Sequence, residues 1–350
     1  MDGAPRHWWW LKKQQIPALR CGMEMQKREL RKLGENRGMD ESGAVRLIAI
    51  DIDGTLAVDG RVSERNLAAI KAAERAGVSV VVATGRRHCY AMKVLRGLGL
   101  GEDDALISSN GTVTRTIGSR LLERTLLPVE TARWLCEHVD EFRDALVMTF
   151  DKVGPDGEDS RGALVVERLE ELNASIGRWM AANEPYILHV DPLERALDGE
   201  APIQIMLCGT VERMRRAEAR LLEHPAISAP SITHTAQLDG DVKLEVALHR
   251  TEYAERNLSI VDILPAGCSK GAALLRLAAA RGVAREEIVA IGDNWNDLSM
   301  LEVAGRAVLM GNAPEDLITL AGERGWTVAK RHDEDGVAGT IEAALAAMAR

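Results

Sequence analysis

The chain has 350 residues, of which 46% are hydrophobic and 28% are charged, a composition typical of a globular protein and not of a disordered one. A chain of this length is long enough for two domains. Its formal net charge of −9 argues against general binding to nucleic acid, because a polyanionic partner would be repelled.

The spacing of the cysteines and the hydropathy of the chain indicate the cellular compartment of the protein. The five cysteines are widely separated and include no CxxC pair, which is typical of reduced thiols and not of a disulfide framework. No apolar run approaches the roughly 18 residues of a membrane-spanning helix, and no segment resembles a secretion signal. We therefore expect a cytoplasmic protein that binds neither nucleic acid nor a membrane. The oligomeric state stays open.

Residues 1–38 differ in kind from the rest. They carry nine Lys or Arg against four acids, which leaves a net charge of −14 for 39–350, and they include the run Trp8, Trp9 and Trp10. Such a basic arm can contact an anionic surface or a partner. The alternative, which we favour, is that translation begins at Met39 and that the preceding segment is disordered or not made. We expect a disordered extension over 1–44.

From Val45 onward, apolar strand patterns alternate with helical ones. The first part of the chain predicts strands over 45–50, 78–83 and 105–109, and helices that begin after Ser63 and over 87–96. The last part predicts helices over 270–280, 294–303 and 336–348, and strands over 288–291, 306–310 and 326–329. This alternation is typical of a parallel α/β sheet with right-handed crossovers.

The middle of the chain has a different pattern of predicted strands and helices. It predicts strands over 145–150, 204–208 and 242–246, and amphipathic helices over 129–141 and 211–223. We expect a Rossmann-like core with helices on both faces of its sheet, formed by 45–116 and 258–350. Residues 117–257 would be an inserted α+β domain.

Acidic side chains follow two of the predicted strands. Asp51 and Asp53 come directly after the first strand, where open α/β sheets place their sites. One acidic pair can be no more than a turn. A second cluster, Asp293 to Asp297 with Asn296, follows another apolar strand, so four carboxylates can converge at one sheet edge. Without a His or Cys cluster, this hard-oxygen environment favours Mg²⁺.

The order of the motifs resembles the haloacid dehalogenase superfamily, and within it the Cof-like phosphatases with a type IIB cap. The resemblance covers about 45–350. It rests on four ordered segments: Asp51-Ile52-Asp53-Gly54-Thr55, Thr84-Gly85-Arg86, Lys270-Gly271 and Gly292-Asp293-Asn294-Trp295-Asn296-Asp297. The Ser109-Asn110-Gly111 turn also looks like this group.

The resemblance implies a role for each site residue. Asp51 would be the nucleophile, and Asp53 the general acid and then base. Thr84 and Lys270 would bind the phosphoryl oxygens and count as catalytic, and Gly85, Arg86, Asn110 and Asn296 would complete the phosphate site. Mg²⁺ would be held by Asp51, the Asp53 carbonyl and Asp293, with Asp297 as a further ligand residue that positions Lys270 or a metal-bound water.

The expected reaction is hydrolysis of a small phosphomonoester, such as a sugar phosphate, through a phospho-aspartyl intermediate, with the inserted domain acting as a specificity cap. Two alternatives stay open. A phosphomutase of the same superfamily would return the phosphoryl group to a sugar, and a regulator would bind a sugar phosphate without turnover. The substrate itself cannot be read from the sequence.

Overall fold

The computed structural model describes residues 44–168, 170–228 and 244–349. The predicted extension over 1–44 therefore lies almost entirely outside the described residues, and so do positions 242 and 243 of the predicted strand 242–246. Within the described ranges, no helix is both long and apolar enough to cross a membrane.

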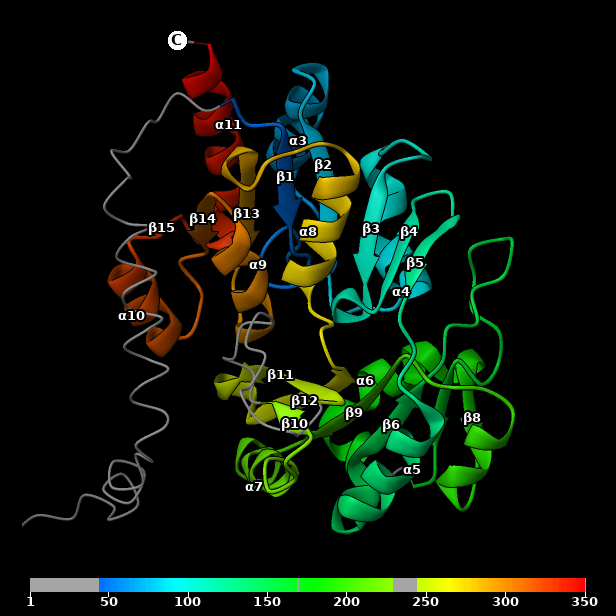
Figure 1. The fold of residues 1–350 in the computed structure, drawn as a ribbon. Helices are drawn as coiled ribbons and strands as arrows, with labels where there is room; N and C mark the ends of the chain where they lie inside the picture. Colours follow the sequence, from blue (N-terminus) through cyan, green and yellow to red (C-terminus); the bar gives the residue numbers. More distant parts are fainter. Residues whose placement is uncertain (1–43, 169, 229–243, 350) are drawn as a thin grey trace, which may run out of the picture. The chain divides into compact units, whose positions relative to one another are not determined.

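The first sheet has eight strands in the order β15-β14-β13-β1-β2-β3-β4-β5. Its strands are β1 (Leu47–Ile50), β2 (Ser79–Ala83), β3 (Ala105–Ser108), β4 (Val113–Thr116), β5 (Leu121–Arg124), β13 (Ile288–Gly292), β14 (Arg306–Leu309) and β15 (Thr327–Val328). Figure 1 shows β1 between β2 and β13, its parallel partners. The predicted Rossmann-like core is confirmed, although β4 and β5 extend it as an antiparallel edge that the sequence pattern did not predict.

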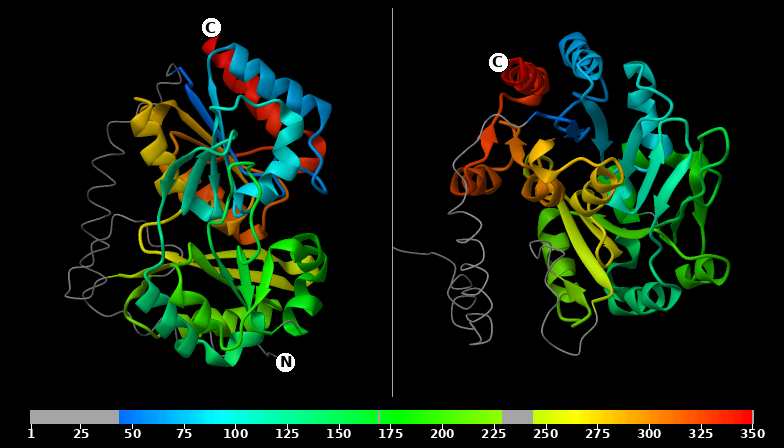
Figure 2. Two further views of the ribbon diagram at one scale, coloured as in Figure 1. Left: turned by 90° about the vertical axis from the view of Figure 1, so that its right-hand side faces the viewer. Right: turned by 45° about the horizontal axis from the view of Figure 1, so that its top comes forward.

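Helices cover both faces of this sheet. They are α3 (Glu64–Arg75), α4 (His88–Leu95) and α11 (Gly336–Met348) on one face, and α8 (Lys270–Ala280), α9 (Leu298–Val303) and α10 (Glu315–Arg324) on the other. Because side chains alternate along a strand, Ile48 and Ile50 pack with the first group and Leu47 and Ala49 with the second. In Figure 2, α11 (red) lies beside α3 (blue).

The start of α3 follows the capping signal in the sequence. The side chain of Ser63 accepts a hydrogen bond from the amide of Asn66, which satisfies one of the helix's unpaired donors. The predicted helix after Ser63 is confirmed, and Lys270 begins α8 as predicted, capped in the same way by Ser269.

A second sheet has seven strands in the order β10-β11-β12-β9-β6-β7-β8. Its elements are β6 (Leu146–Thr149), β7 (Leu164–Val166), β8 (Ile187–His189), β9 (Gln204–Gly209), β10 (Ile227–Ser228), β11 (Val246–Tyr253) and β12 (Leu258–Pro265), with helices α5 (Val129–His138), α6 (Glu170–Asn183) and α7 (Val211–Leu221). The predicted strands over 145–150 and 204–208 and the two predicted helices are confirmed, with both helices ending earlier than expected.

Two details of the second sheet differ from the prediction. The strand expected at 242–246 begins only at Val246 and runs to Tyr253. Residues 258–265, assigned to the core, form β12 between β9 and β11 of the second sheet, whereas β5 of the expected insert pairs with β4 of the first. The assignments of 258–265 to the core and of β5 to the insert both depended on a change in the local pattern of the sequence. Such a pattern does not reveal which strands pair.

Candidate active site

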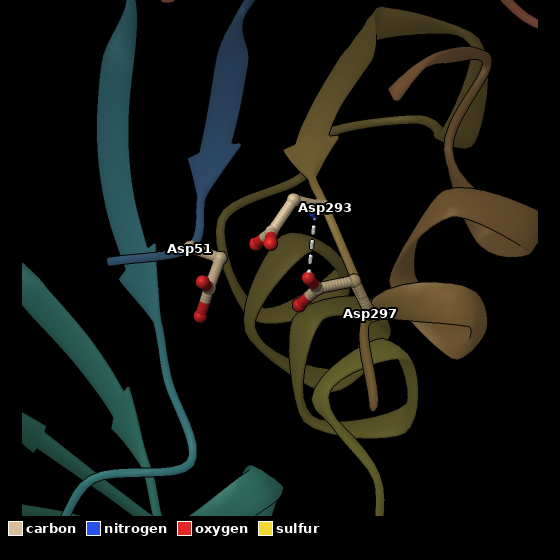
Figure 3. A group of neighbouring side chains, drawn as sticks. All are labelled: Asp51, Asp293 and Asp297. Carbon is tan, nitrogen blue, oxygen red and sulfur yellow. Dashed lines mark hydrogen bonds between the residues drawn. The ribbon is translucent and has the colours of Figure 1, made fainter. Parts of the chain in front are cut away.

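Three carboxylates meet at the carboxyl end of the first sheet. Asp51 follows β1 and Asp293 follows β13, and these strands are neighbours with Ile50 opposite Ile291. Asp297 ends the short 3₁₀ turn Trp295–Asp297, and ligand atoms of the three side chains lie within 4.8 Å of one another. Figure 3 shows Asp51 and Asp293 projecting from the two strand ends toward the same space. The predicted convergence of acids at one sheet edge is therefore present in the fold.

Lys270 is the counter-charge of this cluster. Its fully buried Nζ donates hydrogen bonds of 2.6 Å to Asp51 Oδ1 and of 2.6 Å to Asp297 Oδ1. Burial alone would lower the pKa of Lys270, but the charges of Asp297 and Asp51 outweigh it and raise that pKa. An isolated buried charge would be costly, so Lys270 and the acids require one another.

The carboxylates remain only partly compensated. Burial, followed by the charge of Asp297, raises the pKa of Asp51 to about 7, although Lys270 acts in the opposite direction. Burial and the charges of Asp297 and Asp51 also raise the pKa of Asp293 well above its ordinary value. Like charges that raise each other's pKa are stabilised by a cation, and this set of hard oxygen atoms fits Mg²⁺.

The hydrogen bonds of Asp297 distinguish it from the other two acids. Its Oδ1 accepts from Lys270, and its Oδ2 accepts from the backbone amides of Asp293 at 2.9 Å and Asn294 at 3.1 Å. The dashed line in Figure 3 marks the contact with Asp293. Asp297 therefore fixes the shape of its own loop and the position of Lys270.

Two residues without a predicted role hold Asp293. Thr55 donates its hydroxyl to Asp293 Oδ1 at 2.9 Å, and Asn312 donates to the carbonyl of Gly54 at 2.9 Å and lies 3.5 Å from Asp293 Oδ2. Gly54 has φ of +80°, and a Cβ there would lie 2.3 Å from Asp293 Oδ2, so only glycine fits. Asn312 follows strand β14, and the strand-end rule that found Asp51 also points to it.

Asp53 is clamped by Arg86. The guanidinium donates to Asp53 Oδ2 at 2.6 Å and to Oδ1 at 2.5 Å, a bidentate pair, and also lies over the ring of Tyr90 at 4.8 Å. The Asp53 side chain is 44% exposed. Arg86 was predicted as a phosphate ligand, whereas here it pairs with the expected general acid. Thr84 Oγ1 accepts from the amide of Arg86 at 3.1 Å.

Asn110 connects the two sheets. Its Oδ1 accepts from Asn296 Nδ2 at 3.2 Å, and its Nδ2 donates to Asp262 Oδ2, on β12, at 2.9 Å. Asn110 has φ of +52°, and the next residue, Gly111, has no room for a Cβ, which would lie 2.1 Å from the Ser269 carbonyl. The turn that presents Asn110 is thereby held against the start of α8.

A cavity of about 740 Å³ lies between the acids and the second sheet. Of the predicted site residues, six line it: Asp51, Asp53, Thr84, Gly85, Arg86 and Asn296. Lys270, Asp293, Asp297 and Asn110 are not among its lining residues, although all four are buried. The second sheet contributes residues that the sequence did not single out, among them Gln204, Tyr253 and Asp262.

Asp262 is an acid in an unfavourable setting. Burial raises its pKa from 3.8 to about 7, and the hydrogen bond from Asn110 and the charge of Lys270 offset this only in part. Native Asp262 therefore holds a proton at pH values where the unfolded chain has released it. The free energy of unfolding should fall as the pH rises from about 4 to 7, by up to about 4 kcal/mol from this group.

We therefore predict that Asp262→Asn raises the melting temperature by several degrees at pH 8 and leaves it nearly unchanged at pH 3, below the ordinary pKa of 3.8, where Asp262 is mostly protonated in the folded and in the unfolded chain. Both melting temperatures are measured by thermal unfolding without added metal, with circular dichroism as the signal. Asp103→Asn, at an exposed aspartate, is the matched control and should change neither value. An equal shift of Asp262→Asn at both pH values would contradict the assignment.

The chain matches the model of the haloacid dehalogenase-like hydrolases over residues 48–341. The chain belongs to this family. It is 30% identical to the 5-amino-6-(5-phospho-D-ribitylamino)uracil phosphatase YwtE of Bacillus subtilis, over 86% of this chain and 98% of that protein. It is 29% identical to the pyridoxal phosphate phosphatase YbhA of Escherichia coli, over 77% of this chain and 89% of that protein.

A solved structure supports the same fold. A sugar phosphatase of subclass IIB of the haloacid dehalogenases superposes with a TM-score of 0.64 at 20% identity, over 85% of this chain and 98% of that chain. The family, the fold and the enzyme class predicted from the four motifs are confirmed, and this haloacid dehalogenase-like hydrolase is a phosphatase. The roles of its individual residues stay predictions.

Proposed function

We propose that this haloacid dehalogenase-like hydrolase is a Mg²⁺-dependent phosphatase that hydrolyses a small phosphomonoester through a phospho-aspartyl intermediate on Asp51. The observation that carries the proposal is the placement of Asp51, whose carboxylate lines the cavity while Lys270 holds its Oδ1 from behind. Support for a small phosphorylated metabolite comes from the two relatives, which are named for a phosphorylated ribitylaminouracil and for pyridoxal phosphate.

In this proposal the first step is attack of the Asp51 carboxylate on phosphorus, which forms an acyl phosphate and breaks the bond to the leaving oxygen. Asp53 gives a proton to that oxygen and later takes one from the water that hydrolyses the acyl phosphate. The bidentate contact with Arg86 positions Asp53 beside Asp51 at the cavity wall. Thr84 and Asn296 line the same wall, where their side chains can donate to phosphoryl oxygens.

The metal would be held by the side chains of Asp51 and Asp293 and by the main-chain carbonyl of Asp53. A bound Mg²⁺ supplies Lewis-acid neutralisation of the phosphate's charge against the incoming carboxylate. Asp297 has a different part in the proposal, because its two oxygens are engaged by Lys270 and by loop amides. We therefore assign Asp297 to positioning Lys270 and the Asp293 loop, in preference to direct metal ligation.

We also propose that the chain forms a catalytic core and a specificity cap, with the limits moved from the predicted 117 and 257 to about 125 and 266. The reason is that β5 belongs to the first sheet and β12 to the second. The cap supplies the face of the second sheet that lines the cavity, which suits a domain that contacts the leaving group. Four cysteines in the described part of the chain are free and buried, which supports the proposed cytoplasmic location.

The test is phosphate release from phenyl phosphate by the full chain with Mg²⁺ or Ca²⁺. We expect turnover with Mg²⁺ and a rate at least about tenfold lower with Ca²⁺. The larger ion takes more oxygen ligands in looser geometry and can engage both oxygens of Asp51, which hinders attack. Absence of Mg²⁺-dependent release would refute the proposed function. Equal rates with the two ions would contradict the double role of Asp51 as ligand and nucleophile.

A further inference from the structure

One face of the second sheet forms the wall of the cavity opposite the acids. Alternate residues line it: Gln204 and Met206 on β9, and Leu258, Ile260 and Asp262 on β12. The residues between them pack the other way, with Ile205 and Leu207 of β9 and Val261 and Ile263 of β12 in one core with α5 and α7. The period of two along each strand therefore assigns every lining side chain to the cavity face.

This wall combines apolar side chains with polar ones, among them Thr149, Thr251 and Tyr253 on the neighbouring strands β6 and β11. Met206, Ile260 and Leu258 belong to or pack against an apolar cluster with Trp179 of α6, and Trp179 also lines the cavity. Among these groups lie Gln204 and Asp262, which are 4% and 5% exposed. A few polar groups in an apolar wall are the usual means by which a pocket orients its ligand.

Gln204 has an unused acceptor. Its Nε2 faces Asp262 Oδ1 at 3.5 Å, which turns its Oε1 away from the carboxylate. That Oε1 is buried and has no hydrogen-bond partner among the residues that the structure describes. A buried carbonyl without a donor is costly, and such groups in native proteins require an explanation. Gln204 lines the cavity, so a rotation of its amide toward the cavity would present Oε1 to a donor on a bound ligand, which would supply the missing bond.

Asp262 needs a donor as well. Its Oδ2 accepts from Asn110 at 2.9 Å, whereas its only other hydrogen-bond contact within the described part of the chain is the long one from Gln204. A carboxyl group has lone pairs beyond those of one accepted hydrogen bond whether it is ionised or protonated, so acceptor capacity is left over. Asp262 and Gln204 thus place adjacent acceptor oxygens on the wall that faces Asp51 and Asp53.

We infer that Gln204 and Asp262 form a specificity subsite for the leaving group, and that they select a group with adjacent hydrogen-bond donors. Vicinal hydroxyls of a polyol and the amino edge of a heterocycle both offer this pattern. The inference rests on the proposed function and specifies its substrate class.

The test compares matched pairs of phosphate esters with the full chain and Mg²⁺. D-ribitol 5-phosphate is paired with n-pentyl phosphate, and (4-aminopyrimidin-5-yl)methyl phosphate with benzyl phosphate. For each pair the selectivity is kcat/KM of the donor-bearing ester divided by kcat/KM of its donor-free partner. We expect at least about tenfold selectivity for one pair, because buried polar groups left unpaired by the donor-free ester disfavour its transition state.

Gln204→Met keeps side-chain length and removes the acceptor, and should lower that selectivity about tenfold. Asp262→Asn should lower it in the same direction. Ser259→Ala is the matched control. Ser259 Oγ is also buried without a partner among the described residues, but Ser259 is not a cavity residue, so its selectivity should stay at the wild-type value.

The outcomes separate the inference from the proposed function. If the wild type hydrolyses the donor-free esters but prefers neither donor-bearing ester, the inference is wrong and the phosphatase proposal stands. The inference is also wrong if Gln204→Met and Asp262→Asn keep the wild-type selectivity. If the wild type releases no phosphate from any of the four esters with Mg²⁺, the proposed function itself fails.

Discussion

Asp51→Asn is expected to lower kcat by at least about 10⁴-fold with every phosphate ester, since removing a nucleophile abolishes the covalent route whatever the leaving group. An amide is a poor nucleophile and a weaker metal ligand than a carboxylate. The change also removes one of the two acids that hold Lys270. Steady-state phosphate release and intact-protein mass spectrometry after rapid quench measure the loss and the absence of a phosphorylated species.

The control for this variant is Asp103→Asn, which makes the same chemical change at an exposed aspartate paired with Arg120. It should keep wild-type turnover and the phosphorylated species. Robust steady turnover by Asp51→Asn, or phosphate found on another residue of the wild type, would overturn the mechanism.

Asp53→Asn is expected to behave differently. It keeps its main-chain carbonyl for the metal but cannot transfer the proton, a function worth roughly 10²–10⁴-fold. An aryl phosphate needs little protonation of its leaving oxygen, so phosphorylation of Asp51 should proceed, while hydrolysis of the acyl phosphate lacks its base. Phosphorylated Asp51 should therefore accumulate with phenyl phosphate but not with an alkyl phosphate, as measured by rapid-quench mass spectrometry with Mg²⁺.

The contact with Arg86 provides a second variant for the same step. Arg86→Met removes the bidentate clamp and leaves the carboxyl of Asp53 in place. It should slow turnover less than Asp53→Asn does and should not trap the phosphorylated species, because the base remains. Trapping to the same extent by both variants would mean that hydrolysis of the intermediate needs Arg86 as much as Asp53, which contradicts a base that acts without the clamp.

Much of the core and its acids could be predicted because the signals are local. An apolar run that ends in an acid predicts a buried strand with a carboxylate at its end, and this reasoning located Asp51 and Asp293. The second sheet was harder to predict. Strand β12 follows β11 closely, but its partner β9 lies far back in the sequence, and no local pattern encodes that pairing.

The sequence by itself determined which residues stand at strand ends and helix starts, because the periods of strands and helices and the capping residues act within a few positions. Only the tertiary structure decided what those residues contact. Lys270 and Asp51 are 219 positions apart, Asn110 and Asp262 are 152 apart, and their hydrogen bonds follow from sheet order and helix packing. The same packing paired Arg86 with Asp53 and left the buried amide oxygen of Gln204 without a hydrogen-bond partner among the residues that the structure describes. Such pairings depend on the summed burial of distant apolar segments, which no short stretch of sequence contains.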